Sequence, residues 1–396
     1  CAVIVCHFRS QARVLWQWYN HAEQLAAARG RAILRVNLDE TAICLFPGQA
    51  KGAVFVSKKR LRGEGAQVVA KWKKRCCMTH AAMICDQPDI QPKLPQFVVG
   101  NERTLRQREM AGLRRACPPN VTLVRQKSAW NSAVLTARIV RALGASVRLL
   151  GARGARLQIV LVLDAARIHF HPNVLRACSA AGIWLVFVPA RMTWLLQPLD
   201  TDAFAIFKAE LRCAYQRARL GSADAVGDLS MAEFLECVYG TVRRVLQGRR
   251  WAVTFDRNGL GGRQGGLGNR VLLRLQLDTP EDAPATRPTN ARTLLCFPRR
   301  ARVALDLLWA SFDNVAPPRA SRLLPSAARL SGLAAAPAGL PALRVARCAA
   351  IGTSSSLSGG GAAAVAPALG LASAGERIYG RTRAETRAMK AIADAP

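Results

Sequence analysis

Two apolar runs near the middle of the chain constrain its fold most strongly. Leu157 to Leu163 and Ile183 to Val188 contain no charged residue, and the segment His171 to Ala181 between them has helical spacing of its apolar residues. A strand, a helix and a second strand joined by short links predict a parallel β-α-β unit whose strands are buried on both faces. The chain is therefore predicted to contain an α/β domain.

The region before this unit has a different rhythm. β-Branched and aliphatic residues are frequent from Ala32 to Phe46, and further strand candidates follow at Cys76 to Cys85 and Pro95 to Val99. Three successive strand candidates predict an antiparallel meander. Helices with one apolar face are predicted at Ser132 to Leu143, Asp202 to Leu220 and Met231 to Leu246. The predicted fold class is α/β, a ribonuclease-H-like mixed sheet flanked by helices, with a largely disordered C-terminal tail.

Composition divides the chain into three predicted parts. Residues 1 to 30 form a helical connector, residues 31 to 260 form the α/β domain, and residues 261 to 396 form a low-complexity tail. Residues 314 to 375 contain no acidic residue and are dominated by Ala, Pro, Gly, Ser, Leu and Arg, which leaves little with which to build a specific core. Short helices are expected within the tail at Val303 to Trp309 and Thr382 to Ile392.

The charge balance predicts a polyanionic partner. Lys and Arg number 57 and Asp and Glu 25, which gives a formal net charge of +32; nucleic acid is the leading expectation. Because Arg far outnumbers Lys, part of this excess also fits the drift of a GC-rich coding sequence. Two basic clusters fit contacts with a DNA backbone or a solvated hairpin edge: Lys58, Lys59 and Arg60, and then Lys71, Lys73, Lys74 and Arg75.

Several other protein classes do not fit this sequence. No run of about 18 uncharged apolar residues is present, so we expect no membrane insertion. The 12 cysteines lack the spacing of a zinc module and are expected to be reduced, mostly buried thiols. No serine elbow or phosphate-binding glycine loop is visible, which argues against an unrelated α/β hydrolase or phosphatase.

Three aspartates lie where apolar runs meet turns or helices. Asp164 closes the run from Leu157, Asp200 precedes a predicted long helix, and Asp39 lies in the first strand candidate. The carboxyl ends of parallel strands share one side of a sheet, so these side chains are expected to converge. Like charges this close require cations between them. Two Mg²⁺ or Mn²⁺ ions about 3.5 to 4 Å apart would then support phosphodiester chemistry, although a single Asp in such a position is more often a turn former or helix cap.

The sequence around these aspartates resembles the catalytic core of the DDE superfamily endonucleases, in particular the pogo/Tigger-like transposases and their domesticated relatives. The resemblance spans about Ala32 to Gly259. It is carried by three blocks: Asn37-Leu38-Asp39-Glu40-Thr41, then Leu163-Asp164-Ala165-Ala166-Arg167-Ile168-His169, then Pro189-Ala190-Arg191-Met192-Thr193 with Gln197-Pro198-Leu199-Asp200 and Phe207-Lys208.

The resemblance implies both a function and a set of site residues. Asp39, Asp164 and Asp200 would be catalytic and would bind two Mg²⁺ or Mn²⁺ ions, with DNA as the substrate. The expected substrate and the basic composition predict the nucleus as the location, and a homodimer is a further expectation. His169 matches a family histidine that would orient a phosphate or a carboxylate. Glu40 and Asp202 are near neighbours that could replace or assist the triad, but the strand period of two and the helical spacing i+2 predict that they point elsewhere.

Two departures from the family pattern keep an alternative open. The family usually has Asn after the second aspartate, where this chain has Ala165. The helix-turn-helix region that normally precedes such a core is not present, as expected if the chain, which starts at Cys1, is a fragment. A catalytically inactive, domesticated or decaying transposase that acts as a DNA-binding protein is therefore the alternative.

Overall fold

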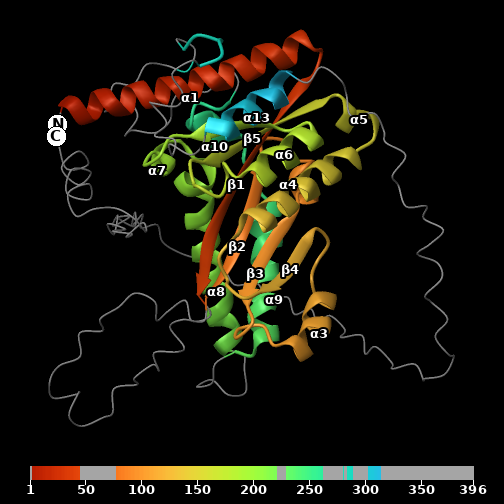
Figure 1. The fold of residues 1–396 in the computed structure, drawn as a ribbon. Coiled ribbons are helices and arrows are strands. Elements are labelled where there is room, and N and C mark those ends of the chain that lie inside the picture. Colours follow the sequence, from red (N-terminus) through yellow and green to blue (C-terminus); the bar gives the residue numbers. More distant parts are fainter. Residues whose placement is uncertain are drawn as a thin grey trace, which may run out of the picture. The chain divides into compact units, whose positions relative to one another are not determined.

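A computed structural model describes residues 2–44, 77–220, 229–261, 280, 283–288 and 302–313 of the chain. All of them belong to one compact unit, Cys1–Arg319 (Figure 1). Among these residues no helix combines the length and the apolar character that a membrane span needs.

A six-stranded mixed sheet forms the centre of this unit. The spatial order of its strands is β4-β3-β2-β1-β5-β6. β1 pairs antiparallel with β2, and β2 with β3, whereas the pairs β1 with β5, β5 with β6 and β3 with β4 are parallel. The strands are β1 (Ala32–Cys44), β2 (Cys77–Cys85), β3 (Gln96–Asn101), β4 (Val121–Gln126), β5 (Leu157–Asp164) and β6 (Trp184–Val188). The meander and the β-α-β unit predicted from the sequence are both confirmed.

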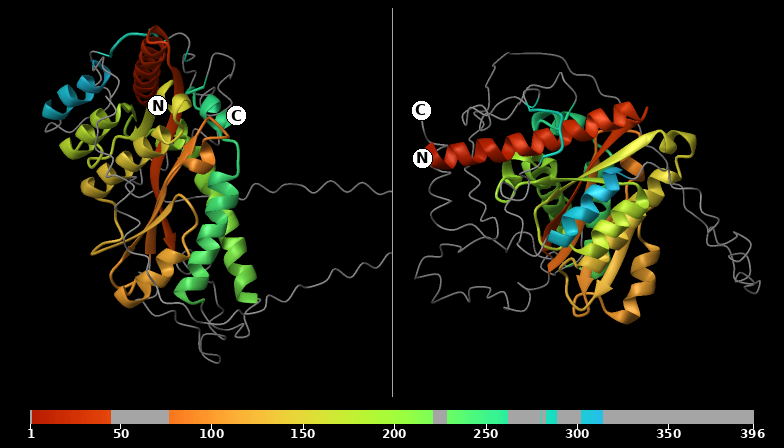
Figure 2. Two further views of the ribbon diagram at one scale, coloured as in Figure 1. Left: turned by 90° about the vertical axis from the view of Figure 1, so that its right-hand side faces the viewer. Right: turned by 45° about the horizontal axis from the view of Figure 1, so that its top comes forward.

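Helices cover both faces of the sheet. In Figure 2 (left), α4 (Ala133–Arg148), α6 (Pro172–Ala181) and α13 (Arg302–Asp313) lie on one side of the strands, and α8 (Phe204–Leu220) and α9 (Met231–Thr241) lie on the other. Burial on both faces explains why β5 and β6 are continuous apolar runs. The fold class is therefore α/β with a mixed, helix-flanked sheet, as the sequence predicts.

The remaining elements are short helices and turns. They are η2 (Gln91–Lys93), η3 (Gln107–Glu109), α3 (Met110–Arg115), α5 (Ala152–Ala155), α7 (Thr193–Leu196), the π-helical turns η4 (Leu199–Ala203) and η5 (Val242–Gln247), and α10 (Ala252–Arg257). The helix predicted from Asp202 therefore begins as a π-helical turn. The single turn of η4 matters because it carries Asp200.

The N-terminal helix packs on the domain. α1 (Ala2–Ala28) is one continuous helix, and its Trp16, Trp18 and Tyr19 side chains are buried in the core. The aromatic ring of Trp18 lies 5.9 Å from that of Phe187 in β6. The segment predicted as a connector therefore contributes core residues.

A helix from the predicted tail also contributes to this core. In α13, the ring of Phe312 stacks on that of Trp184 at a centroid distance of 5.0 Å, and Trp309 lies 5.2 Å from Trp18. The helix expected at Val303 to Trp309 is thus confirmed and packs into the compact unit. Most of the remaining tail, including Thr382 to Ile392, lies outside the described residues.

Glutamine side chains form hydrogen bonds with the part of the β2 backbone that does not pair with β3. β3 pairs with β2 only as far as Ala81. Beyond it, Gln96 Nε2 donates to the Met83 carbonyl at 2.8 Å and Gln96 Oε1 accepts from the Met83 amide at 3.2 Å. Gln91 Oε1 accepts from the Cys85 amide at 2.5 Å. These buried amides replace the missing ladder hydrogen bonds.

Two predictions need correction. β4 was not expected; its parallel pairing with β3 follows Asn120, which adopts a left-handed φ of 64°. The thiols were expected to be mostly buried. Of the described free cysteines, Cys85 and Cys178 are buried and Cys213 is exposed, with Cys117 and Cys237 between these extremes.

A candidate carboxylate site at the strand ends

The three aspartates come from three different elements. Asp39 lies within β1, opposite Ala82 of β2, and is 9% exposed. Asp164 is the last residue of β5, a neighbour of β1 in the sheet, and its side chain is 30% exposed. Asp200 is exposed on the π-helical turn η4 that leads into α8. A central strand, an adjacent strand end and a helix entrance therefore each supply one carboxylate.

One buried amide joins these three segments. Asn37, two residues before Asp39, is fully buried. Its Nδ2 donates to the Val162 carbonyl in β5 at 2.9 Å, and its Oδ1 accepts from the Leu199 amide at 2.8 Å. Val162 is two residues before Asp164, and Leu199 directly precedes Asp200. Asn37 therefore fixes the register between the backbone segments that carry the aspartates.

The electrostatics of Asp39 reflect this arrangement. Burial raises the pKa of Asp39 well above its usual range, and the negative charges of Asp200, Asp164 and Glu40 raise it further. The amide of Glu40 donates to Asp39 Oδ1 at 2.7 Å and opposes the rise. A buried carboxyl surrounded by like charges favours binding a proton or a metal cation.

His169 holds the second aspartate. Its Nδ1 lies 2.7 Å from Asp164 Oδ1, and its Nε2 lies 3.7 Å from Glu40 Oε1. Burial lowers the pKa of this fully buried imidazole, but the hydrogen bonds and charges of Asp164 and Glu40 outweigh burial and raise it. The imidazolium therefore bridges the carboxylates of β1 and β5. The nearby His171 instead caps α6 by accepting from the Asn173 amide.

Glu40 was expected to point away from the site. Successive side chains of a strand do point to opposite faces, yet Glu40 still reaches His169 and also accepts a hydrogen bond from Asn131 Nδ2. Asn131 in turn donates to Thr136 Oγ1 at 2.9 Å at the start of α4. Glu40 therefore connects the carboxylate site to α4. Within the described residues, Asp202, half-buried on η4, makes no comparable connection.

The donor set suits a hard divalent cation. Carboxylate oxygens are the ligands that Mg²⁺ and Mn²⁺ prefer. Burial raises the pKa of Asp39, and the negative charges of Asp200, Asp164 and Glu40 add to the rise. Within the described residues, no three or more His, Cys, Asp and Glu side chains stand at metal-ligand spacing. One carboxylate oxygen of Asp164, Oδ1, is directed at His169 Nδ1.

Other predicted site residues have different outcomes. The basic clusters at Lys58, Lys59 and Arg60 and at Lys71, Lys73, Lys74 and Arg75 lie outside the described residues. Ala165 packs against the hydrophobic core. Trp184 is a core residue. Sequence reasoning missed the roles of Asn37 and Asn131, although a polar residue inside an apolar strand, two positions before an aspartate, is a usable signal.

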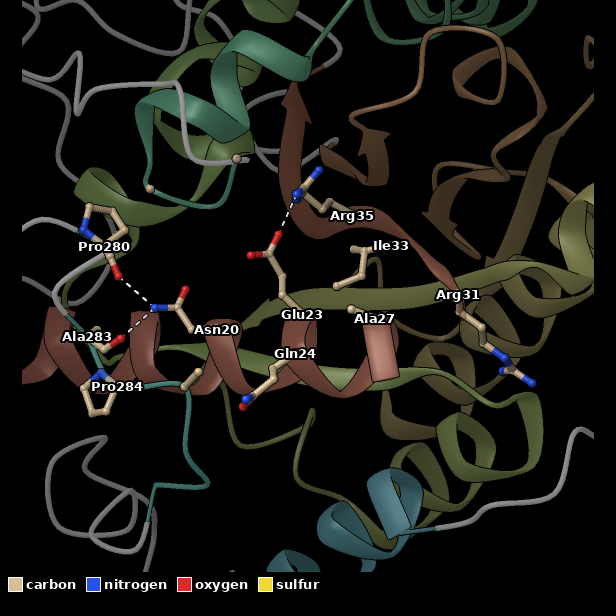
Figure 3. A pocket seen from close by; sticks show the side chains of 13 residues that line it. Asn20, Glu23, Gln24, Ala27, Arg31, Ile33, Arg35, Pro280, Ala283 and Pro284 are labelled. Carbon is tan, nitrogen blue, oxygen red and sulfur yellow. Dashed lines mark hydrogen bonds and ion pairs between the residues drawn. The ribbon is translucent and has the colours of Figure 1, made fainter. Parts of the chain in front are cut away.

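A cavity of about 1010 Å³ lies between α1, the first half of β1 and residues 259, 261, 280 and 283–285 (Figure 3). Two of its charged side chains are paired with each other: Arg35 contacts Glu23 at 2.7 Å. Arg35 also contacts Asp86 at 2.6 Å, and Arg31 donates to the Gln158 amide oxygen at 3.2 Å. The Asn20 amide is also satisfied, since it donates to the carbonyls of Pro280 and Ala283. This cavity shows the paired charges of a structural contact, and we place the candidate site at the aspartates.

Comparison with known proteins gives one family. The family model described as "DDE superfamily endonuclease" matches residues 78–245. The matched stretch runs from β2 to η5 and contains Asp164, His169 and Asp200, while Asp39 lies before its start. No curated protein matches the chain, and no solved structure does. Residues 78–245 of the chain are therefore similar to the DDE superfamily endonucleases.

Proposed function

We propose that this protein is a transposase-derived, metal-dependent DNA endonuclease and strand transferase of the pogo/Tigger type. The observation that carries the proposal is the Asn37 linkage, because it joins the three backbone segments that bear Asp39, Asp164 and Asp200. The raised pKa of Asp39 adds support, since its causes after burial are the other two aspartates. The family implies DNA as the substrate, and nuclear residence is part of the proposal.

The residues suggest a division of labour. Asp39, Asp164 and Asp200 would hold two Mg²⁺ or Mn²⁺ ions. When bound, such ions activate a water or a 3′-hydroxyl and stabilise the leaving oxygen of the broken phosphodiester. Asn37 would keep the carboxylates in register, and His169 would balance the charge of Asp164 and Glu40 while the ions are absent. Water and a 3′-hydroxyl are interchangeable nucleophiles, so cleavage and joining can share one site.

The experiment is a nicking assay with supercoiled DNA. Full-length protein is expected to nick the DNA with Mg²⁺ or Mn²⁺ and not with EDTA. Asp164→Asn is expected to abolish nicking, whereas Asp202→Asn, the matched control on η4, should retain it. Equal nicking by wild type and Asp164→Asn would overturn the assignment.

A catalytically inactive DNA-binding protein is the second candidate, because Ala165 stands where the family usually has Asn. It predicts DNA binding without nicking under every metal condition. Ala165→Asn then becomes informative: gain of nicking on this substitution would identify the chain as a disabled enzyme with an otherwise intact site.

A further inference from the structure

The surface next to the carboxylate site carries an exposed tryptophan that no step above uses. Trp130 is 69% exposed and Val134, one helical turn further, is 72% exposed. Most other large apolar side chains of the described residues are buried. Singly exposed apolar residues are common, but an exposed tryptophan beside charged groups indicates a contact surface.

The backbone around Trp130 is held in place on both sides. Gln126, the last residue of β4, donates to the Trp130 carbonyl at 2.5 Å, and the Trp130 amide donates to Ser128 Oγ at 3.2 Å. The next residue, Asn131, donates to Glu40, the neighbour of Asp39. The indole is therefore presented from a fixed loop at the rim of the carboxylate site.

The helix that follows is basic on its outer face. Residues 127–148 contain no Asp or Glu, and the exposed positions of α4 include Arg138, Arg141 and Arg148. Arg138 lies four residues, about 6 Å, beyond Val134 along the helix. It also lines a hollow of about 370 Å³ together with Arg114 of α3. An aromatic platform followed by a basic track is the pattern that binds single-stranded nucleic acid.

We propose that Trp130 stacks on an unpaired base of the DNA strand at the reaction site, while the outer face of α4 follows the phosphates of that strand. This inference rests on the proposed DNA substrate and adds a contact that is separate from the metal chemistry. Charge complementarity favours a nucleic acid as the occupant, since repulsion between arginines opposes a second copy of the same basic face. Trp130 is thus a substrate-positioning residue.

The test measures binding without metal, in EDTA, using the full chain. The probes are a labelled oligothymidylate and an abasic oligomer of the same length. Trp130→Ala is expected to weaken oligothymidylate binding about tenfold, the range of one base–aromatic stack, and to leave binding of the abasic oligomer unchanged. Trp130→Phe should restore most of the affinity. Leu149→Ala is the matched control, because Leu149 is 87% exposed just beyond the other end of α4.

The salt dependence separates the two parts of the surface. Arg138→Gln is expected to weaken the binding of both probes. It should also reduce the magnitude of the slope of log K against log salt by about 0.7, the contribution of one phosphate contact on a single strand. Trp130→Ala should leave that slope unchanged. Thermal unfolding midpoints equal to wild type would show that each variant is folded.

Two results would overturn the inference. The first is an unchanged preference of Trp130→Ala for oligothymidylate over the abasic oligomer. The second is that Trp130→Ala loses a dimer on size-exclusion chromatography while its DNA binding is unaltered. That result would make this surface a contact between protein copies. Asp164→Asn should keep the base preference. Absence of nicking by the wild type under every metal condition, with the base preference retained, would overturn the proposed function alone.

Discussion

Arg35 and Asp39 lie four residues apart on the same side of β1, and their surroundings differ completely. Arg35 contacts Glu23 from α1 and Asp86 from the chain after β2, so the protein supplies its counter-charges. Asp39 is buried among the charges of Asp200, Asp164 and Glu40. In one half of the strand the charges are paired within the fold, whereas in the other half Asp39 is surrounded by like charges.

This difference separates structural charge from functional charge. A buried ion pair with good geometry offsets its own desolvation cost, whereas a buried cluster of one sign persists only where another role retains it. The contrast predicts opposite effects of neutralising the two residues: removal of Arg35 destabilises the fold, and removal of the Asp39 charge stabilises it.

The largest expected effect is a loss of stability when Arg35 is replaced, in the half of β1 whose charges are paired. Arg35→Leu leaves Glu23 and Asp86 without their counter-charge and is expected to cost about 3–5 kcal/mol of unfolding free energy. Urea denaturation measures this loss. Arg35→Lys, which cannot contact both carboxylates in the same way, should fall between wild type and Arg35→Leu. A loss below 1 kcal/mol in Arg35→Leu would contradict the matched-charge description.

A third kind of buried ionisable group lies on the neighbouring strand β2. Burial lowers the pKa of His80 to about 4, although its contact with Gln96 opposes this. The unfolded chain therefore binds a proton below its ordinary pKa near 6.5, while the folded chain does not until about pH 4. Stability is expected to fall by about 3 kcal/mol as the pH drops through this window.

The measurement is the free energy of unfolding in urea at about pH 7.5 and about pH 4.5, for wild type and for His80→Leu. The variant lacks the titrating group, so its stability should fall less over this range than that of wild type. Parallel pH profiles for both proteins would show that His80 is not the source of the acid sensitivity.

Residue patterns explain why most of the fold could be predicted and why parts of the site could not. β5 and β6 were predictable because burial on both faces demands uninterrupted apolar runs. β4 was missed because its short sequence, with Thr122 and Arg125, lacks such a run. His169 contacts Asp164 through a loop whose path depends on tertiary packing, so sequence periodicity carries no information about it. The burial of α13 depends on the contact between Trp184 and Phe312, which lie more than a hundred residues apart in the sequence.

Asn37, which links the backbone segments that carry the three aspartates, gives a further test of the comparison between the two halves of β1. Asn37→Leu leaves the Val162 carbonyl and the Leu199 amide without their partner, which is expected to cost about 1–3 kcal/mol. Nicking should fall more than this stability loss explains, because the aspartates lose their register. The two readouts are urea unfolding and single-turnover nicking at a temperature where the variant is folded. Unchanged nicking would show that Asn37 does not position the site.

Substitution of Asp39 is expected to change the stability of the fold least, and to raise it, whereas substitution of Arg35 lowers it. Since the folded-state pKa of Asp39 is raised, its ionisation destabilises the fold as the pH rises above the ordinary Asp range. Asp39→Asn removes this penalty and should raise the unfolding temperature in EDTA at neutral pH by a few degrees. A lower unfolding temperature would mean that the charge of Asp39 is compensated within the chain.

Titration of the full-length protein with Mn²⁺, followed by electron paramagnetic resonance of the free ion, tests the account most directly. Wild type is expected to bind Mn²⁺ saturably, with about two ions per chain, and the triple substitution of Asp39, Asp164 and Asp200 by Asn should remove that binding. Saturable binding of equal strength in the triple variant, or none in wild type, would contradict the claim that these carboxylates form a metal site.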